Sequence, residues 1–442
     1  MKKVFSFFFL LTCFLPALAQ EGFVFEKNIE KIVIPFKFIN NLIFIPIKVN
    51  GIELNFLLDT GVEETILFSM EDKKEVNFFN VEKIKLRGLG SEESIEGLKS
   101  TNNTLEINEF KSKDHLLYIV LDQSFNLSSH VGIPVNGIIG YNFFKTNLVE
   151  INYEKKRVII YQDLEKYRKK IEKKFRAVDI SIERSKPYFN GSVVMNSIEI
   201  PVKLLIDVGN SDAIWLFENH SKSIEVPEKN FVDYLGKGFS GDVEGRRGQI
   251  SKFKISEFEF HNPIVAFPDS SSIKNVKMVT DRSGSIGSEI LKRFTIVFDY
   301  SNKKMFLRKN GGFNAPFSYN KSGVDIQHNG LQWVEETVRL ETVPITGVSF
   351  DSDGNRISNN FKYKFELKPI YEIANVRKNS PAAISGLQKG DVVVSINNMR
   401  AYRYSLEKIK EILKSEEERW IIFEIERNGQ IIKFKFKLIN EL

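Results

Sequence analysis

The sequence predicts a mainly β protein in which one β-rich unit occurs twice and a smaller α+β module follows. Three observations carry this prediction: short alternating apolar runs, a segment pattern that repeats at a fixed spacing, and a change of pattern near residue 311. Phenylalanine occurs 38 times, and β-branched and aromatic residues gather in runs such as 31–36, which is typical of strands. A chain of 442 residues also exceeds what one hydrophobic core organises, so several domains are expected.

Residues 1–19 are typical of an export signal peptide. Two lysines precede an apolar stretch from Val4 to Leu15, and Ala17-Leu18-Ala19 is typical of a cleavage site. The apolar stretch is too short to span a bilayer, so no transmembrane helix is expected. The single cysteine, Cys13, lies inside this segment, which excludes disulfides and thiol catalysis in the mature chain. We expect an exported protein that is periplasmic, envelope-associated or extracellular, with a lipid anchor on Cys13 as an alternative to cleavage.

The composition is that of a globular protein and gives no indication of nucleic-acid binding. Hydrophobic residues make up 42% of the chain, charged residues 27%, and the formal net charge is only +6. The densest basic stretch, residues 166–176, is interspersed with glutamates, which is typical of a solvated helix. We expect a linker helix over residues 163–176, with its helical turns from Leu164 to Arg176.

An internal repeat organises the chain before residue 311. The segment Phe56–Gly61 recurs as Leu204–Gly209 at an offset of 148 residues (207 − 59). The segment Gly137–Gly140 recurs as Gly284–Gly287 at an offset of 147 residues (287 − 140). Coincidence explains such constant spacing poorly, whereas duplication of one unit explains it well.

The repeat and its end divide the chain into domains. We expect lobe 1 over residues 20–162 and lobe 2 over residues 177–310, joined by the linker helix. After Gly311-Gly312 the repeated pattern stops, which indicates a linker. Residues 311–442 are expected to form the separate C-terminal module.

The segment Leu57–Leu67, which contains Asp59-Thr60-Gly61, resembles the catalytic loop of aspartic proteases. Together with Gly137–Gly140 it is similar in particular to the compact retropepsin-type lobe. The resemblance covers about residues 30–310. It implies two acid-protease β-barrel lobes that donate Asp59 and Asp207 to one active site, a peptide or protein substrate, and no cofactor.

The chemistry explains why both aspartates are needed. One carboxylate cannot both activate a water molecule and supply a proton to the scissile carbonyl, whereas two carboxylates that share one proton can do both. Two negative charges so close together cannot both form readily, so the pKa values of the pair split. Asp59 and Asp207 are therefore the predicted catalytic residues.

The residues that follow each aspartate are expected to support the loops. Gly61 and Gly209 allow a tight turn in which backbone N–H groups face the carboxylates. By resemblance, Thr60 hydrogen-bonds across to the opposite lobe, but Val208 at the matching position has no hydroxyl group. Two hypotheses stay open: an aspartic-type endopeptidase, and a catalytically inactive peptide-binding or scaffold protein of the cell envelope.

A glycine-rich segment about 30 residues after each catalytic loop is typical of a mobile β-hairpin that could cover an active site. The candidate flap residues are Gly88, Gly90, Gly97, Gly241 and Gly245.

Other hydrolytic chemistries lack their motifs. The histidines are scattered and form no His-Glu-X-X-His arrangement, so no metal site is expected, and we interpret them as surface or turn residues. They are His115, His130, His220, His261 and His328. No Gly-X-Ser-X-Gly segment indicates a serine hydrolase.

The segment Ser380–Asn398 resembles the core of bacterial PDZ domains. A predicted helix over Ser405–Lys414 and two predicted strands, Trp420–Arg427 and Ile431–Leu438, follow in the order expected for that fold. PDZ domains bind a peptide as an added strand and hold its C-terminal carboxylate with backbone N–H groups.

The resemblance implies a C-terminal peptide ligand for this module. The candidate binding residues are Gly323, Val324, Asp325 and Ile326. Residues between this loop and Tyr371 are interpreted as an insertion with a hairpin tip at Asp351–Gly354. The alternative is a module that serves only for packing or dimerisation.

Overall fold

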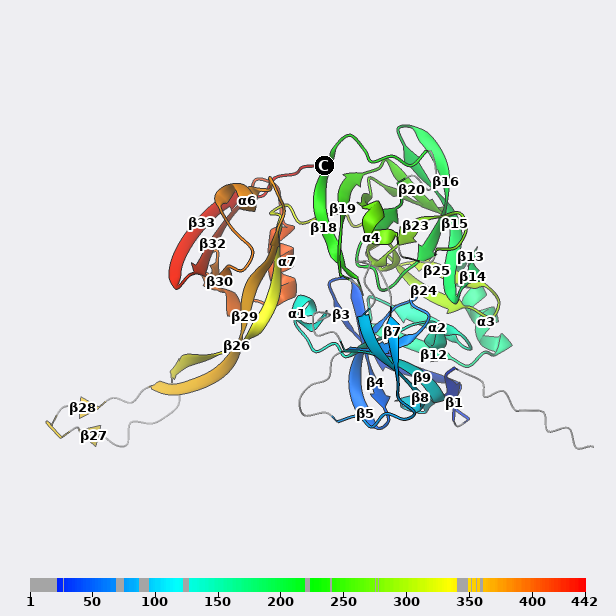
Figure 1. Ribbon diagram of the computed structural model, residues 1–442, viewed down its shortest axis with the longest axis horizontal. Helices are drawn as coiled ribbons and strands as arrows, with labels where there is room; N and C mark the ends of the chain where they lie inside the picture. Colours follow the sequence, from blue (N-terminus) through cyan, green and yellow to red (C-terminus); the bar gives the residue numbers. More distant parts are fainter. Residues whose placement is uncertain are drawn as a thin grey trace, which may run out of the picture.

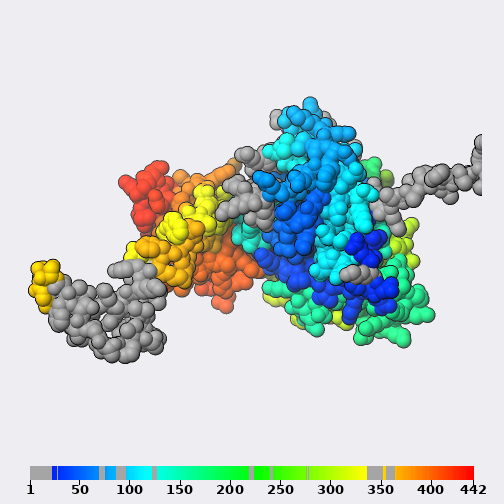
Figure 2. Space-filling model, turned by 90° about the horizontal axis from the view of Figure 1, so that it is seen from below, coloured from blue at the N-terminus to red at the C-terminus, as the bar shows by residue number. Residues whose placement is uncertain are grey.

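The computed structural model describes residues 22–26, 28–68, 75–86, 95–121, 127–218, 223–238, 241–274, 276, 278–339, 349–350, 352–354, 356–357 and 361–442. The predicted signal peptide lies outside these residues. Two β-rich lobes form the main body, and the C-terminal module stands to one side of it (Figures 1 and 2). The mainly β prediction is confirmed. None of the described helices is long and apolar enough to cross a membrane.

In the described part of lobe 1, nine strands form one sheet in the order β1-β9-β6-β10-β5-β4-β8-β7, with β3 beside β4. The strands are β1 (Val24–Phe25), β3 (Lys37–Ile39), β4 (Leu42–Val49), β5 (Ile52–Leu58), β6 (Thr65–Leu67), β7 (Glu82–Leu86), β8 (Ile95–Ile107), β9 (Phe110–Val120) and β10 (Gly137–Ile139). The helices are α1 (Leu127–Val131) and α2 (Tyr141–Phe144). Strand β10 runs parallel to β5 and antiparallel to β6.

In the described part of lobe 2, ten strands form a sheet in the order β18-β19-β22-β17-β23-β16-β15-β20-β21, with β14 beside β15. The strands are β14 (Ser181–Glu183), β15 (Lys186–Met195), β16 (Ile198–Ile206), β17 (Ile214–Leu216), β18 (Asn230–Gly238), β19 (Gly241–Gln249), β20 (Lys252–Ile255), β21 (Phe258–His261), β22 (Ile264–Pro268) and β23 (Arg282–Ile286). The helices are α4 (Ser270–Ile273) and α5 (Ser288–Leu291).

The strands next to the two Asp-X-Gly loops repeat one arrangement. Strand β23 runs parallel to β16 and antiparallel to β17, as β10 does between β5 and β6. Gly137 stands opposite Phe56 in lobe 1, and Gly284 stands opposite Leu204 in lobe 2. The offsets seen in the sequence therefore correspond to equivalent positions of one duplicated unit.

A third sheet is shared by both lobes and has the order β13-β25-β24-β11-β12-β2. Its strands are β2 (Lys31–Pro35), β11 (Leu148–Asn152), β12 (Arg157–Tyr161), β13 (Arg176–Asp179), β24 (Phe294–Asp299) and β25 (Lys304–Lys309). The two copies meet where β11 pairs with β24, and every residue of these two strands is buried. Because the hydrophobic core continues from lobe 1 through this sheet into lobe 2, the lobes form one body.

The helix between the lobes is α3 (Glu165–Glu172), which is shorter than expected. The predicted extension of the helix to Arg176 is wrong, because Arg176 already pairs with Leu307 as the first residue of β13. The buried residue of α3, Ile171, packs against Val297 and Phe306 of the shared sheet. Strand pairing thus overrides the helical composition of the last residues.

The C-terminal module has a sheet of its own in the order β26-β29-β30-β32-β33, with β31 beside β30. Its strands are β26 (Val324–Arg339), β29 (Phe361–Val376), β30 (Val392–Ile396), β31 (Met399–Arg400), β32 (Trp420–Arg427) and β33 (Gln430–Lys437). Its helices are α6 (Pro381–Ser385), the 3-10 turn η1 (Ala401–Arg403) and α7 (Leu406–Leu413). A separate hydrophobic core lies beneath them.

Local sequence signals explain the two longer helices of the module. The Ser380 hydroxyl accepts a hydrogen bond from the N–H of Ala383 at the start of α6, and Gly386 ends that helix with φ = 100°. The Ser405 hydroxyl accepts from the N–H of Lys408 at the start of α7. The predicted insertion is a long antiparallel ribbon of β26 and β29 that projects from the module, with β27 (Ser349–Phe350) and β28 (Arg356–Ile357) near its tip (Figure 1).

Candidate active site

The two catalytic loops have the same backbone geometry. The N–H of Asp59 donates to the carbonyl of Ile139 at 3.0 Å, and the N–H of Asp207 donates to the carbonyl of Ile286 at 2.9 Å. Within each turn, the glycine N–H donates to its own aspartate: Gly61 to Asp59 Oδ1 at 2.7 Å, and Gly209 to Asp207 Oδ1 at 3.1 Å. The Asp-X-Gly turns therefore aim both carboxylates in the same way.

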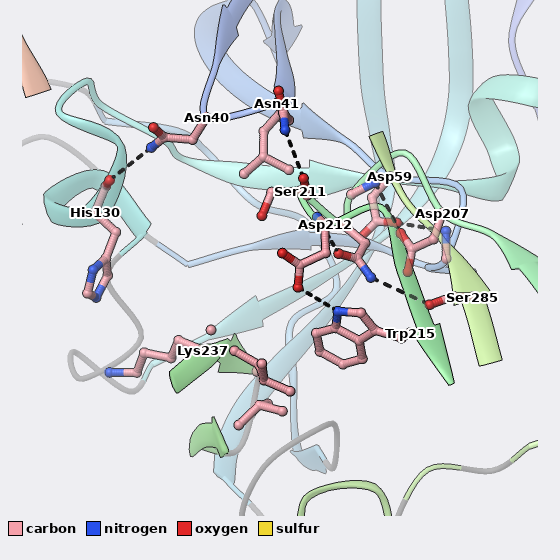
Figure 3. A pocket seen from close by; sticks show the side chains of 18 of the residues that line it. Asn40, Asn41, Asp59, His130, Asp207, Ser211, Asp212, Trp215, Lys237 and Ser285 are labelled. Carbon is pink, nitrogen blue, oxygen red and sulfur yellow. Dashed lines mark hydrogen bonds between the residues drawn. The ribbon is translucent and has the colours of Figure 1, made fainter. Parts of the chain in front are cut away.

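The loops bring Asp59 and Asp207 together (Figure 3). A Cβ atom on Gly209 would lie 2.2 Å from Cγ of Asp59, and a Cβ atom on Gly61 would lie 3.1 Å from Cγ of Asp207. Each glycine therefore gives the opposite carboxyl group the space it occupies. Gly61 and Gly209 were predicted because the turns are tight. The structure adds a second reason, which is that a side chain at either position would collide with the opposite aspartate.

Burial raises the pKa of both carboxyl groups. Burial, followed by the charge of Asp207, raises the pKa of Asp59 well above the ordinary value. Burial also raises the pKa of Asp207, but the cation of Arg282 and the hydrogen bond from Asp59 oppose that rise. The two carboxyl groups therefore titrate as one pair, in which the cation of Arg282 favours the charged form of Asp207.

Thr60 links the two loops across the lobe boundary. Its hydroxyl donates to the carbonyl of Ile206 at 2.6 Å and accepts from the N–H of Val208 at 3.0 Å. Val208 is fully buried and offers no hydroxyl in return. The carbonyl of Val208 accepts instead from the Ser288 hydroxyl of α5 at 3.0 Å, a support within lobe 2.

The aspartates open into one large cavity of about 1780 Å³. The two lobes are joined at this cavity by Asn41, whose Nδ2 donates to the backbone carbonyl of Ser211 at 2.9 Å (Figure 3). The same Nδ2 donates to Glu289 Oε2 at 2.9 Å. A cavity of this volume exceeds the usual range for a single small ligand. Its size is suited to an extended polymer.

Two β-hairpins contribute to the cavity wall, β7–β8 in lobe 1 and β18–β19 in lobe 2. Gly241 pairs with Gly238 at the end of the second hairpin. Gly97 lies between β7 and β9, and Gly245 lies between β18 and β22, so both belong to the body of a sheet and not to a hairpin tip. Gly88 and Gly90 lie outside the described residues.

Arg247 of β19 connects this hairpin to the second catalytic loop. Its Nη1 contacts Asp212 Oδ1 at 2.9 Å, and its Nε contacts Asp233 Oδ2 at 2.6 Å. Asp212 also accepts from the indole N–H of Trp215 at 2.7 Å (Figure 3). Asp233 Oδ1 in turn lies 3.8 Å from Nη1 of Arg377 in the C-terminal module. These ion pairs were not predicted, because the charged residues that form them lie far apart in the sequence and share no local pattern.

His115 departs from the sequence interpretation of the histidines. It is buried in β9, where its ring nitrogens contact the hydroxyl groups of Thr65 and Ser112, each at 2.7 Å. Burial lowers the pKa of His115 to about 4, so the ring is neutral. The interpretation as a surface or turn residue is wrong here, because Thr65 and Ser112 satisfy the ring inside the sheet.

The candidate PDZ loop has its backbone donors already engaged. Asn320 Oδ1 accepts from the N–H groups of Ser322 at 3.1 Å and Gly323 at 3.3 Å, and the Ser322 hydroxyl accepts from the N–H of Val324 at 3.0 Å. Asn320 Nδ2 donates to the carbonyl of Val324 at 2.8 Å. A ligand carboxylate would have to displace Asn320 to reach these donors.

The module faces the cavity with the end of this loop and with α7. Asp325 and Ile326 line the cavity together with Lys410, whose Nζ donates to the carbonyl of His130 in α1 at 3.2 Å. Burial raises the pKa of Asp325 to about 6 and lowers the pKa of Lys410 to about 8. Of the four candidate residues, Asp325 and Ile326 therefore face the cavity, whereas Gly323 lies beside Ser380 and Val324 belongs to the core of the module.

Among the described residues, no group of three or more histidine, cysteine, aspartate or glutamate side chains could hold a metal ion.

Two segments of the chain match known protein families. Residues 45–143 match a family described as aspartyl protease, and residues 372–427 match a family described as PDZ domain. Among solved structures, the chain is similar to an aspartic proteinase from Irpex lacteus, at 12% identity and a TM-score of 0.41, over 64% of this chain and 98% of that chain. No curated protein matches the chain. The chain thus contains a segment, residues 45–143, that is similar to aspartyl proteases and a later segment, residues 372–427, that is similar to PDZ domains.

Proposed function

We propose that the chain is an aspartic-type endopeptidase that hydrolyses peptide bonds with a water molecule activated between Asp59 and Asp207. The observation that supports this proposal is the meeting of the two carboxyl groups, each packed against the glycine of the opposite Asp-X-Gly turn. The duplicated lobes supply both halves within one chain. A peptide in the cavity could therefore reach the pair without a second subunit.

The uneven pKa values give the two carboxyl groups different roles. Asp207, which carries the charge beside Arg282, accepts a proton from the attacking water. Asp59, which carries the shared proton, donates it to the oxygen of the scissile carbonyl. The C–O bond forms as the carbonyl becomes a tetrahedral diol. Asp207 then donates its new proton to the amide nitrogen while Asp59 takes a proton from a diol hydroxyl group. The C–N bond breaks, a carboxylic acid and an amine are released, and the starting protonation of the pair is restored.

The test is hydrolysis of a diverse peptide pool between about pH 3 and 7, the range expected for a carboxyl pair. Asp59→Asn and Asp207→Asn should each abolish cleavage, with folding verified by circular dichroism. Hydrolysis that persists in either variant would refute the two-carboxylate mechanism. A folded wild-type protein that cleaves nothing across this range would instead favour the inactive peptide-binding protein, for which the one-sided contact of Thr60 is the structural argument.

For the PDZ domain we infer peptide or protein binding, with C-terminal peptides as the candidate ligands. Because Asn320 caps the loop donors, binding should be weak until this side chain moves. Asn320→Gly should strengthen binding of C-terminal peptides to the full chain, measured by fluorescence anisotropy, while amidated peptides serve as controls. Absence of binding in both proteins would leave the domain as a packing module.

We also infer that residues 1–19 direct export. Deletion of this segment should retain the protein in the cytoplasm, and mass spectrometry of the mature protein would show whether its N-terminus follows Ala19 or whether Cys13 carries a lipid.

A further inference from the structure

The pseudo-twofold relation of the lobes is broken beside the catalytic pair. In lobe 1, Phe44 stands opposite Leu57, and in lobe 2, Tyr188 stands opposite Leu205, so Phe44 and Tyr188 are equivalent. Two residues earlier, Leu42 of lobe 1 therefore corresponds to Lys186 of lobe 2.

A second substitution of the same kind lies on the neighbouring strand. Gly137 and Gly284 are equivalent, and two residues before them lobe 1 has Val135 whereas lobe 2 has Arg282. Leu42 and Val135 belong to an apolar cluster on the lobe-1 side of the cavity. The duplicated unit thus places two apolar residues on one side of the pair and two cations at the same positions on the other.

The Arg282 side chain is fixed by contacts within lobe 2, but its two Nη atoms remain available to a ligand. Its side chain is 7% exposed, its Nε donates to the carbonyl of Gly284 at 3.0 Å, and its guanidinium lies 5.1 Å from the ring centre of Phe217. Among the described residues neither Nη atom has a hydrogen-bond partner, and Arg282 lines the cavity beside Asp207. A buried guanidinium with a free fork is suited to a carboxylate.

Lys186 is the second cation of this wall. It lines the cavity at the start of β15 and forms no ion pair or side-chain hydrogen bond within the described part of the chain. Its charge reaches both members of the pair, because it lowers the pKa of Asp59 and of Asp207. Most other cavity-lining cations of lobe 2 have partners, such as Arg247 with Asp212 and Lys292 with Glu289.

We propose that Lys186 and Arg282 bind a carboxylate of the peptide substrate on the lobe-2 side of the scissile bond, while the lobe-1 side binds an apolar residue. This inference rests on the proposed peptidase function and names its substrate class. The carboxylate is that of an aspartate or glutamate side chain or of the peptide C-terminus, since both present the same two oxygens.

The test compares matched peptides that carry Glu, Gln or Leu at each position around a cleaved bond, each with a free and an amidated C-terminus. The Glu peptide should have a kcat/KM about 10- to 100-fold above the Gln peptide, mainly through KM. The preference should grow from about pH 3 to 6 as the substrate carboxyl group ionises, and it should fall with added salt. If the site binds the C-terminus instead, the Glu and Gln peptides will be cleaved equally and amidation will lower kcat/KM for all three peptides.

Lys186→Gln and Arg282→Gln should each bring the Glu-to-Gln ratio of kcat/KM close to one. The ratio is compared at each pH, because both cations also lower the pKa of Asp207 and their loss changes cleavage of every peptide. Lys203→Gln is the matched control, because Lys203 stands opposite Arg282 on β16 but pairs with Glu183 away from the cavity. Leu42→Lys should add an acidic preference on the lobe-1 side. If Arg282 serves only to support Asp207, its loss will shift the pH profile and leave the Glu-to-Gln ratio unchanged, which would overturn the proposal.

A binding measurement separates this inference from the proposed function. Glu and Gln peptides are titrated into Asp59→Asn by fluorescence anisotropy at about pH 6, where the free glutamate is ionised. Tighter binding of the Glu peptide supports the carboxylate site even if the wild type cleaves nothing. Equal affinity of the two peptides, together with an affinity that amidation of the C-terminus does not change, overturns it, even if the wild type is an active peptidase.

Discussion

Thr60 and Val208 occupy equivalent positions of the two catalytic loops, yet only Thr60 reaches across to the other loop. Its hydroxyl group donates a hydrogen bond to the carbonyl of Ile206 and accepts one from the N–H of Val208, and both partners belong to lobe 2. The duplicated geometry gives a hydroxyl group at position 208 the same two partners in lobe 1, the carbonyl of Leu58 and the N–H of Thr60. Valine fills the space but makes neither hydrogen bond.

Exchanging these side chains should change stability in opposite directions. Thr60→Val keeps the volume but leaves two buried backbone groups without a partner, so the free energy of unfolding should fall by roughly 1–3 kcal/mol. Val208→Thr should raise it by about 0.5–1 kcal/mol. Urea denaturation measures both changes, and kcat should follow the same order. A Thr60→Val protein as stable as the wild type would show that the crossing hydrogen bonds contribute nothing net.

The two turn glycines should tolerate alanine unequally. A Cβ atom at position 209 would lie 2.2 Å from Cγ of Asp59, a distance that packing cannot absorb, whereas at position 61 the nearest atoms of Asp207 lie at 3.1 Å. Gly209→Ala should therefore displace Asp59 and abolish activity, and Gly61→Ala should reduce kcat by a smaller factor. Equal losses in the two variants would contradict this asymmetry. Gly51→Ala, with no atom within 4 Å, reports the effect of an alanine outside the site, although its φ of 90° adds local strain.

The sequence predicted what repeats or follows a local motif. The offset of Asp59 and Asp207 predicted the duplicated strand arrangement, and the Asp-X-Gly turns predicted the position of both carboxyl groups. The buried contact of His115 with Thr65 was missed because strand pairing joins residues that are far apart in the chain. For the same reason no pattern indicated that Arg247 would connect the hairpin to Asp212.

The activity should have a bell-shaped pH dependence set by the pair. The acidic limb reports uptake of a second proton by the pair and the basic limb reports loss of the shared proton. Burial raises the pKa of both Asp59 and Asp207. Arg282→Gln removes a cation that lowers the pKa of Asp207, so the acidic limb should move to higher pH. Measurement of kcat/KM from about pH 3 to 8 on an uncharged peptide provides the test. An acidic limb that stays in place would show that Arg282 does not influence Asp207.

The buried pair should also cost stability at neutral pH. A carboxyl group whose pKa is higher in the folded than in the unfolded state stabilises the fold most fully below the unfolded pKa, and this contribution is lost as the pH rises through the folded pKa. Asp59→Asn should therefore raise the melting temperature at pH 7, with a gain that shrinks towards pH 4. Glu416→Gln, on an exposed carboxylate, is the control. A gain that is constant with pH would indicate a cause other than ionisation.

Substitution of Arg247 should lower the free energy of unfolding far more than substitution of a surface lysine. Arg247→Met leaves Asp212 and Asp233 without their shared cation in a site where all three side chains are at most 17% exposed, so the free energy of unfolding should fall by roughly 2–3 kcal/mol. Lys252→Met breaks the more exposed pair with Glu259 and should cost at most about 1 kcal/mol.

Substitution of Arg247 should lower kcat as well as the free energy of unfolding. Asp212 lies five residues after Asp207, and its backbone N–H donates to Asn210 Oδ1 at 2.9 Å, so a displaced Asp212 disturbs the second catalytic loop. Arg247→Met should therefore lower kcat, while Arg247→Lys, which keeps the charge but lacks the fork that contacts both carboxylates, should recover stability only in part. The double variant Arg247→Met with Asp212→Asn measures the coupling between the two residues. A coupling energy near zero, together with unchanged kcat in Arg247→Met, would show that the hairpin and the loop act independently.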